Sequence, residues 1–178
     1  GCGDVEKSQP KRVGPTFRRQ AGASGAVNLD RLFDNMFGAA SWSPEAPVFM
    51  EIGHQERGRL ERSAKVQSYR KTDQWDCTYA GGTKPSMLVL FTGNGIGFEA
   101  TDFDGMDSSN LPTVVINSVT ERGATVLDLC TGRGLTATSA LRLDRRFLGV
   151  EINPYRMSVA LANIAKEMGE RPTLRDQL

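Results

Sequence analysis

The stretch ATVLDLCTGRGLTATSALRLDRRFLGVE, residues 124–151, decides the fold class. It begins with an apolar run, Ala124–Cys130, that predicts a buried strand leading into a glycine-containing turn. Arg133–Arg142 predicts a helix, and Arg146–Glu151 predicts a second strand. A strand, a helix and a strand in this order build a parallel sheet with a right-handed crossover. The stretch therefore predicts an α/β protein.

The turn after the first strand carries the clearest chemical signal. Gly132 and Gly134 allow a sharp turn and let a ligand approach the backbone without meeting a Cβ atom. Asp128 at the strand end would repel a pyrophosphate, but it suits the cationic amino-acid end of S-adenosylmethionine. Glu151 ends the next strand about 20 residues later, where a carboxylate can accept hydrogen bonds from two ribose hydroxyls. Taken alone, the glycine turn is equally consistent with a ligand-free strand–helix connection. The joint pattern favours a cofactor site.

The remaining sequence predicts a single Rossmann-like domain over residues 29–178, with its cofactor half at 108–168. We expect a three-layer α/β fold with a mostly parallel sheet and an antiparallel hairpin at one edge. The elements expected outside the deciding stretch are a helix from the N-cap Asn28 to Gly38, a strand at Val48–Ile52, a surface helix at 54–65, strands at 73–79 and 86–92, a loop at 93–111, and helices at Thr113–Thr120 and Pro154–Met168.

Composition limits the classes of function. A chain of 178 residues with a formal net charge of +1 fits one domain and is no nucleic-acid-binding polycation, although a local basic patch is compatible with it. We find no apolar run of the roughly 20 residues that a membrane helix needs, and no signal segment. The three cysteines show no CxxC spacing and suit a reducing, cytoplasmic location. Because His54 is the only histidine, we expect no multi-histidine metal site.

Residues 1–28 form a basic segment with little predicted structure. Pro10 and Pro15 break helices, and residues 21–26 are typical of a flexible linker. The basic side chains between them suit a solvated tail or a contact with a phosphate backbone. Both interpretations stay open.

Residues 127–164, LDLCTGRGLTATSALRLDRRFLGVEINPYRMSVALANI, resemble the cofactor motif of the DNA amino-methyltransferases. Those enzymes methylate N6 of adenine or N4 of cytosine. The sections GATVLDLCTGRG and RRFLGVEINPYRMSVA are most similar to the permuted subgroups, in which the cofactor motif follows the catalytic motif. The resemblance implies S-adenosylmethionine as cofactor, DNA as partner, and direct attack of the base amine on the sulfonium methyl group.

The resemblance also assigns residues to the cofactor site. The segment Asn110–Thr113 is similar to a lysine–proline segment that flanks the cofactor, with Leu111 at the lysine position. Arg133 has no single assignment, since it could reach a cofactor carboxylate or a DNA phosphate. Cys130 is interpreted as a small buried hydrophobe within the site rather than a nucleophile. The predicted cofactor-binding residues are Asp128, Cys130, Thr131, Gly132, Gly134, Glu151, Asn153 and Pro112.

The family's catalytic tetrapeptide, a polar residue followed by Pro-Pro and an aromatic residue, is absent from the sequence. In the permuted order it belongs upstream of residue 28, at the end of a central strand, and no apolar strand occurs there. Met50–Gly53 fits the motif less well. Three explanations stay open: the strand comes from a missing N-terminal segment or a second chain, the motif has diverged within residues 1–28, or the fold closes around fewer strands. The catalytic residues are therefore unassigned.

Other reactive or aromatic residues have ordinary interpretations. We expect Asp4 and Glu6 to be surface charges, Trp42 and Trp75 to pack in the core or at its rim rather than stack on a base, and His54 to lie at the surface. Two other functions stay open beside DNA methylation. One is a non-catalytic interaction module with a vestigial cofactor site, and the other is methylation of RNA, protein or a small molecule.

Overall fold

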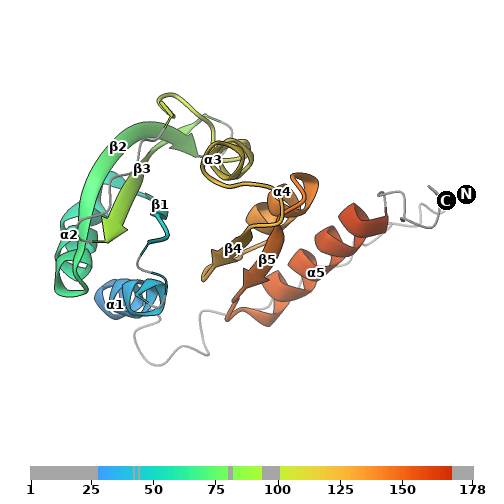
Figure 1. Cartoon of the computed structure of the whole chain (residues 1–178), viewed down its shortest axis with the longest axis horizontal. Coiled ribbons are helices and arrows are strands. Elements are labelled where there is room, and N and C mark those ends of the chain that lie inside the picture. The colour runs from blue at the N-terminus through green and yellow to red at the C-terminus, as the bar shows by residue number, and fades with distance from the viewer. Residues whose placement is uncertain (1–27, 42, 44, 80–81, 94–100, 170–178) are drawn as a thin grey trace, which may run out of the picture.

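The chain folds into two groups of helices and strands that follow one another in sequence (Figure 1). The computed structural model describes residues 28–41, 43, 45–79, 82–93 and 101–169. The first group contains α1 (Leu29–Ala40), β1 (Val48–Ile52), a 3₁₀ turn (His54–Glu56), α2 (Arg57–Val66), β2 (Tyr69–Tyr79) and β3 (Lys84–Gly93). The second contains α3 (Leu111–Val119), β4 (Thr125–Asp128), α4 (Leu135–Arg142), β5 (Arg146–Gly149) and α5 (Pro154–Gly169).

The first group is built on a three-stranded antiparallel sheet with the order β1-β3-β2. The central strand β3 is buried from Ser86 to Gly93, as expected for a strand that is covered on both faces. The predicted hairpin of β2 and β3 is confirmed, although both strands are longer than expected. Strand β2 already pairs with β3 at Tyr69, opposite Gly93, and the Tyr69 side chain is buried.

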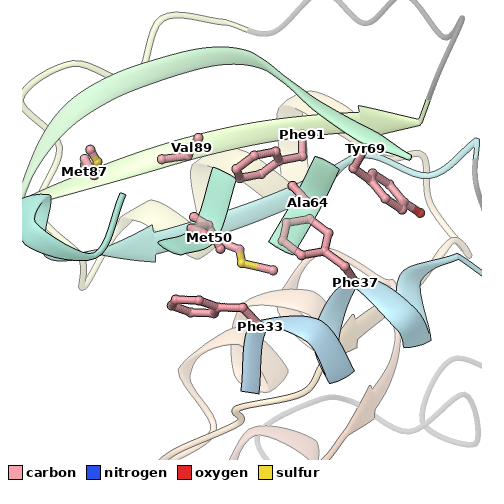
Figure 2. Close-up of a cluster of buried hydrophobic side chains, with 9 residues drawn as sticks. Phe33, Phe37, Met50, Ala64, Tyr69, Met87, Val89 and Phe91 are labelled. Atoms are coloured by element: carbon pink, nitrogen blue, oxygen red, sulfur yellow. The ribbon is translucent and has the colours of Figure 1, made fainter. Parts of the chain in front are cut away.

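Alternate residues of β3 enter two cores on opposite faces of this sheet. Figure 2 shows the first core, in which Phe33 and Phe37 of α1 point toward Met50 of β1 and toward Val89 and Phe91 of β3. The phenylalanine rings of residues 37 and 91 meet edge to face, with centroids 5.0 Å apart. The second core lies under α3 and is formed by Trp75, Cys77, Leu88, Leu90, Phe103, Leu111 and Val115. The antiparallel sheet therefore has helices on both faces.

The second group is the predicted strand–helix–strand–helix unit. Strands β4 and β5 pair in parallel, with Leu127 opposite Leu148 and Asp128 opposite Gly149. Helix α3 joins this unit to the antiparallel sheet, because it also contacts α4 through a 2.8 Å hydrogen bond between the hydroxyls of Thr113 and Ser139. At the other end of α3, Arg145 donates to the hydroxyl of Thr120 over 3.0 Å.

The expectation of one mostly parallel sheet is wrong for the described residues. They form two separate sheets, and β4 with β5 is the single parallel pair among the named strands of this part of the chain. The first sheet is antiparallel because β3 runs antiparallel to both β1 and β2. The two sheets are separate because no described strand pairs with both β1 and β4. The coarser prediction of a mixed α/β fold is confirmed.

Helix boundaries follow local chemistry and differ from prediction by a few residues. The N-cap at Asn28 is confirmed, because its side-chain oxygen accepts a 3.0 Å hydrogen bond from the Arg31 amide. Helix α1 continues past Gly38 to Ala40, where the Ser41 amide caps it. The expected basic segment at 1–28, including Asp4 and Glu6, lies outside the described residues except for Asn28, and Trp42 also lies outside them. No helix in the described ranges could span a membrane.

Candidate cofactor-binding site

The loop after β4 is held by hydrogen bonds to the strand ends. The side chain of Asp128 accepts a 2.9 Å hydrogen bond from the Cys130 amide. The buried Thr131 donates its hydroxyl to the Asp128 carbonyl over 3.2 Å and its amide to the Val150 carbonyl over 3.0 Å. Asp128 and Thr131 therefore fix the loop between the carboxyl ends of β4 and β5.

Glu151 joins the end of β5 to the same loop. One carboxylate oxygen accepts a 2.9 Å hydrogen bond from the Gly132 amide, and the other accepts a 2.7 Å hydrogen bond from the Asn153 amide. Asp128 is the last residue of β4, and Glu151 follows the end of β5. Because the two strands are parallel neighbours, both acids lie at the same edge of the sheet. The structure thus brings these two acids to one place, as the sequence pattern predicts.

The two glycines of the loop have different physical roles. Both have left-handed backbone torsions, with φ of 59° at Gly132 and 86° at Gly134. A Cβ atom on Gly134 would lie 3.1 Å from Ala160 of α5, whereas a Cβ atom on Gly132 would meet only the Cys130 carbonyl, at 3.7 Å. Gly134 therefore permits close packing of α5, and Gly132 leaves the backbone accessible beside Glu151.

We expect Gly134→Ala to lower the free energy of unfolding by about 2–4 kcal/mol, because strain at positive φ adds to a clash with α5. Gly82→Ala is the matched control. Gly82 has a similar φ of 81°, but a Cβ atom there has nothing within 4 Å, so its cost should be about 1–2 kcal/mol. Urea unfolding of both variants measures the difference. Equal losses would show that the contact with Ala160 contributes nothing.

Two of the predicted cofactor residues already have structural roles, and one prediction about burial is wrong. Asn153 accepts hydrogen bonds from the amides of Tyr155 and Arg156, at 3.0 and 3.2 Å, and so caps α5. Thr131 holds the loop in place through its hydrogen bonds to the carbonyls of Asp128 and Val150. Cys130 is exposed rather than buried, because the loop turns its residue outward. Desolvation within the loop nevertheless raises the pKa of its thiol, and the carboxylates of Asp128 and Glu151 raise it further.

Of the predicted cofactor-binding residues, Pro112 lies on a different element from the loop and the strand ends. Pro112 stands in the first turn of α3, which packs against α4 rather than forming part of the loop. The carbonyl of Arg133 accepts a 2.9 Å hydrogen bond from the Asn163 side chain, and its guanidinium role stays a prediction. Trp75 is buried against Phe103, with ring centroids 4.8 Å apart, which confirms the packing interpretation. His54 lies at the surface, as expected, 3.9 Å from Asp76.

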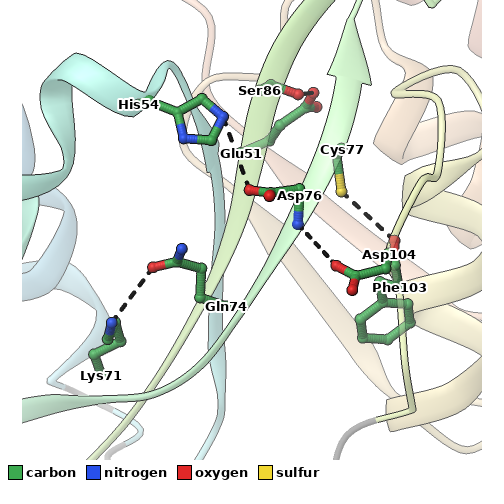
Figure 3. A network of polar contacts seen from close by, with 9 residues as sticks. All are labelled: Glu51, His54, Lys71, Gln74, Asp76, Cys77, Ser86, Phe103 and Asp104. Atoms are coloured by element: carbon green, nitrogen blue, oxygen red, sulfur yellow. Dashed lines mark hydrogen bonds and ion pairs between the residues drawn. The ribbon is translucent and has the colours of Figure 1, made fainter.

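A polar network at the end of β1 was not predicted from the sequence. Figure 3 shows Glu51 beside Ser86, whose hydroxyl donates to the glutamate carboxylate over 2.8 Å. Desolvation raises the pKa of Glu51, the nearby Asp107 raises it further, and the hydrogen bond from Ser86 opposes both. An acid within the otherwise apolar strand 48–52 is the signal that could have identified it.

The raised pKa of Glu51 predicts a pH-dependent effect on stability. The contribution of Glu51 to the free energy of unfolding is complete at pH values below the pKa of this carboxyl in the unfolded chain. It is lost as the pH rises through the higher pKa of the same carboxyl in the folded chain. Glu51→Gln keeps an acceptor for the Ser86 hydroxyl and removes this pH-dependent loss of stability. We expect it to raise the free energy of unfolding by less than about 1 kcal/mol at about pH 8, and to change it little near pH 4.

Urea unfolding at both pH values measures this difference. Glu45→Gln is the control, and it should lower the free energy of unfolding at about pH 8 instead of raising it. The reason is that hydrogen bonds from its own backbone and from Ser43 lower the pKa of Glu45. A stabilisation by Glu51→Gln that is equal at both pH values would contradict the proposed desolvation.

The sequence matches a family model over residues 53–162, more than half of the chain. The family is N6_N4_Mtase, described as DNA methylase, and the chain belongs to it. This match confirms the resemblance to DNA amino-methyltransferases. No curated protein sequence matches the chain at a significant level.

Several solved structures share the fold. M1.HpyAVI in complex with S-adenosylmethionine is 11% identical with a TM-score of 0.63, over 74% of this chain and 81% of that one. TTHA0409 from Thermus thermophilus, named as a putative DNA modification methylase and also complexed with S-adenosylmethionine, is 16% identical with a TM-score of 0.64, over 80% and 77%. The cytosine-N4-specific PvuII DNA methyltransferase is 12% identical with a TM-score of 0.58, over 88% and 81%.

Proposed function

We propose that this chain binds S-adenosylmethionine at the ends of β4 and β5 and serves in methyl transfer to an exocyclic amino group of a DNA base. The observation that carries the proposal is the arrangement of Asp128 and Glu151 at neighbouring parallel strand ends, with the Gly132 amide donating to Glu151. Membership of the DNA methylase family and the S-adenosylmethionine complexes of two similar structures support it.

The residues at this edge of the sheet fit such a cofactor. Each carboxylate oxygen of Glu151 accepts one backbone amide and keeps a lone pair for a further donor, as a ribose hydroxyl would be. Asp128 is partly exposed and can lie near a positive charge. Gly132 has no side chain to block the approach. When bound, the cofactor supplies an electrophilic methyl group on a positively charged sulfonium.

The acceptor and the catalytic motif are further parts of the proposal. Two of the similar structures are named as a putative DNA modification methylase and as a cytosine-N4-specific DNA methyltransferase, which supports DNA as the partner. The sequence contains no Pro-Pro pair, so the tetrapeptide implied by the family resemblance has no counterpart in these 178 residues. We therefore propose that this chain supplies the cofactor half and that a further segment supplies the catalytic motif. The missing tetrapeptide also favours the second candidate, a non-catalytic module that keeps the cofactor site.

Isothermal titration of the chain with S-adenosylmethionine tests the cofactor site. We expect saturable one-to-one binding, and no binding of NAD, whose pyrophosphate Asp128 would repel. Protection of residues 128–134 and 151 from amide exchange should accompany binding. Absence of binding, or equal binding of NAD, would overturn the assignment. Binding without transfer after the catalytic segment has been restored would favour the non-catalytic module.

A further inference from the structure

Arg133 stands between the two glycines of the cofactor loop, and it lines a groove between helices α4 and α5. The groove has a volume of about 320 Å³. We call it the α4–α5 groove, and its lining residues are Arg133, Leu135, Thr138, Arg142, Asn163, Lys166 and Glu167. Three of these residues are cations and one is an acid, so the groove has a net positive charge. It is therefore a candidate binding site for an anion beside the cofactor loop.

Contacts at both ends of the groove hold its walls in place. Just before α4 begins, the Arg133 carbonyl accepts a 2.9 Å hydrogen bond from the Asn163 side chain on α5. Where α4 ends, the Nε of Arg142 donates to the Glu167 carboxylate on α5 over 2.8 Å. Because each contact ties α5 to α4 or to the loop before it, the groove is formed by the folded chain itself, as ligand sites usually are.

The ion pair of Arg142 and Glu167 determines which charge the groove presents to solvent. The Glu167 side chain is 11% exposed, whereas the Arg142 side chain is 60% exposed. Glu167 uses only the Nε of Arg142, so the remaining N–H groups of the guanidinium can donate to another acceptor. Arg133 and Lys166 are exposed as well. The single carboxylate is thus largely covered, and the accessible charge of the groove is positive.

A phosphate group fits this arrangement better than a carboxylate does. The planar guanidinium of an arginine can donate to two phosphate oxygens at once, and a lysine adds a compact positive charge. A phosphate monoester carries about −1.5 to −2 charges near pH 7, which is close to the surplus of two positive charges among the lining residues. A single carboxylate would leave one of these charges uncompensated. Cations gathered in a cleft also attract an anion more strongly than cations spread over a surface.

We propose that the α4–α5 groove binds a phosphate group through Arg133, Arg142 and Lys166. The phosphate belongs either to a small phosphate-bearing molecule or to a DNA backbone, since both present the same group. This assignment gives Arg133 a role outside the cofactor pocket, although the residue stands in the cofactor loop. The proposal concerns anion binding alone and does not depend on S-adenosylmethionine binding or on methyl transfer.

Phosphorus NMR titration tests the groove with inorganic phosphate as the probe, at constant ionic strength and without cofactor or DNA. We expect saturable broadening of the phosphate signal. Arg133→Gln and Lys166→Gln should each weaken binding at least about fivefold, because each removes a charge-assisted hydrogen bond. Arg133→Lys keeps the charge and should recover most of the binding. Arg156→Gln is the matched control: it removes an exposed arginine of α5 outside the groove and should change binding less than about twofold.

Competition identifies the source of the phosphate. Displacement of phosphate by a short DNA duplex at lower concentration than by adenosine 5′-monophosphate would indicate the DNA backbone, and the reverse order a small molecule. The proposal would be overturned if phosphate did not bind saturably, if acetate at the same ionic strength bound equally well, or if Arg156→Gln lost as much binding as Arg133→Gln. It would also be overturned if Arg133→Gln weakened S-adenosylmethionine binding and left phosphate binding unchanged. Thermal unfolding shows that each variant is folded.

Discussion

Glu151→Ala is expected to weaken S-adenosylmethionine binding by about 1–3 kcal/mol, because a charged acceptor for the ribose hydroxyls is lost. The structure adds a second reason. The carboxylate also accepts the amides of Gly132 and Asn153, so its removal releases the loop that faces the cofactor. Glu151→Gln should lose less, since its amide oxygen can still accept one of these hydrogen bonds.

Calorimetric titration of each variant measures the dissociation constant. Glu121→Ala is the control, because it removes the same charge from an exposed position before β4, at the opposite end of that strand. Thermal unfolding without cofactor shows how much of the loss comes from a loosened loop. A dissociation constant that does not change in Glu151→Ala would remove this residue from the site.

The second half of the chain could be predicted because its signals are local. An apolar run, an acid, two glycines and a helix lie within a few turns of one another, and their order alone requires parallel strand ends at one edge. Even so, β4 ends at Asp128 rather than Cys130. The Asp128 side chain accepts the Cys130 amide and starts the loop earlier than the apolar run suggests.

The roles of individual site residues were harder to predict than the elements that carry them. Gly134 is needed where α5 approaches through Ala160, a residue 26 positions away. Asn153, predicted to contact the cofactor, also caps the helix that begins at Pro154. Cys130 belongs to an apolar run and yet is exposed. A distant neighbour thus decides the role of Gly134, whereas the cap at Asn153 is a local interaction with the amides of Tyr155 and Arg156.

The sheet was the least predictable part, because strand pairing joins residues that are distant in sequence. The expected parallel sheet required a central strand that the sequence does not show, and the described strands form two sheets. Helix α3 explains how these sheets stay together, through Leu111 and Val115 in one core and Thr113 against α4. The pattern of residues 113–120 predicted a helix but could not indicate this bridging role.

The 178-residue chain alone is expected to transfer no methyl group to DNA. The family resemblance places catalysis on a polar-Pro-Pro-aromatic tetrapeptide, which the sequence lacks. That tetrapeptide would end a strand beside the cofactor strand, and the open edge of β4 is where such a strand could pair. Without it, no group in the described residues is assigned to hold the target amine.

Restoring the segment should restore transfer. A second polypeptide with an apolar strand that ends in Asp-Pro-Pro-Tyr should raise tritiated-methyl transfer to DNA at least about 100-fold, because activity requires the amine to be positioned beside the cofactor. The same polypeptide ending in Ala-Ala-Ala-Tyr should raise the temperature of unfolding equally, since its strand satisfies the same edge groups, but should restore no transfer. Robust methylation by the chain alone would mean that catalytic residues lie within residues 1–53. If both polypeptides raised the temperature of unfolding and neither restored transfer, the strand pairing would be supported and the assignment of the activity would be wrong.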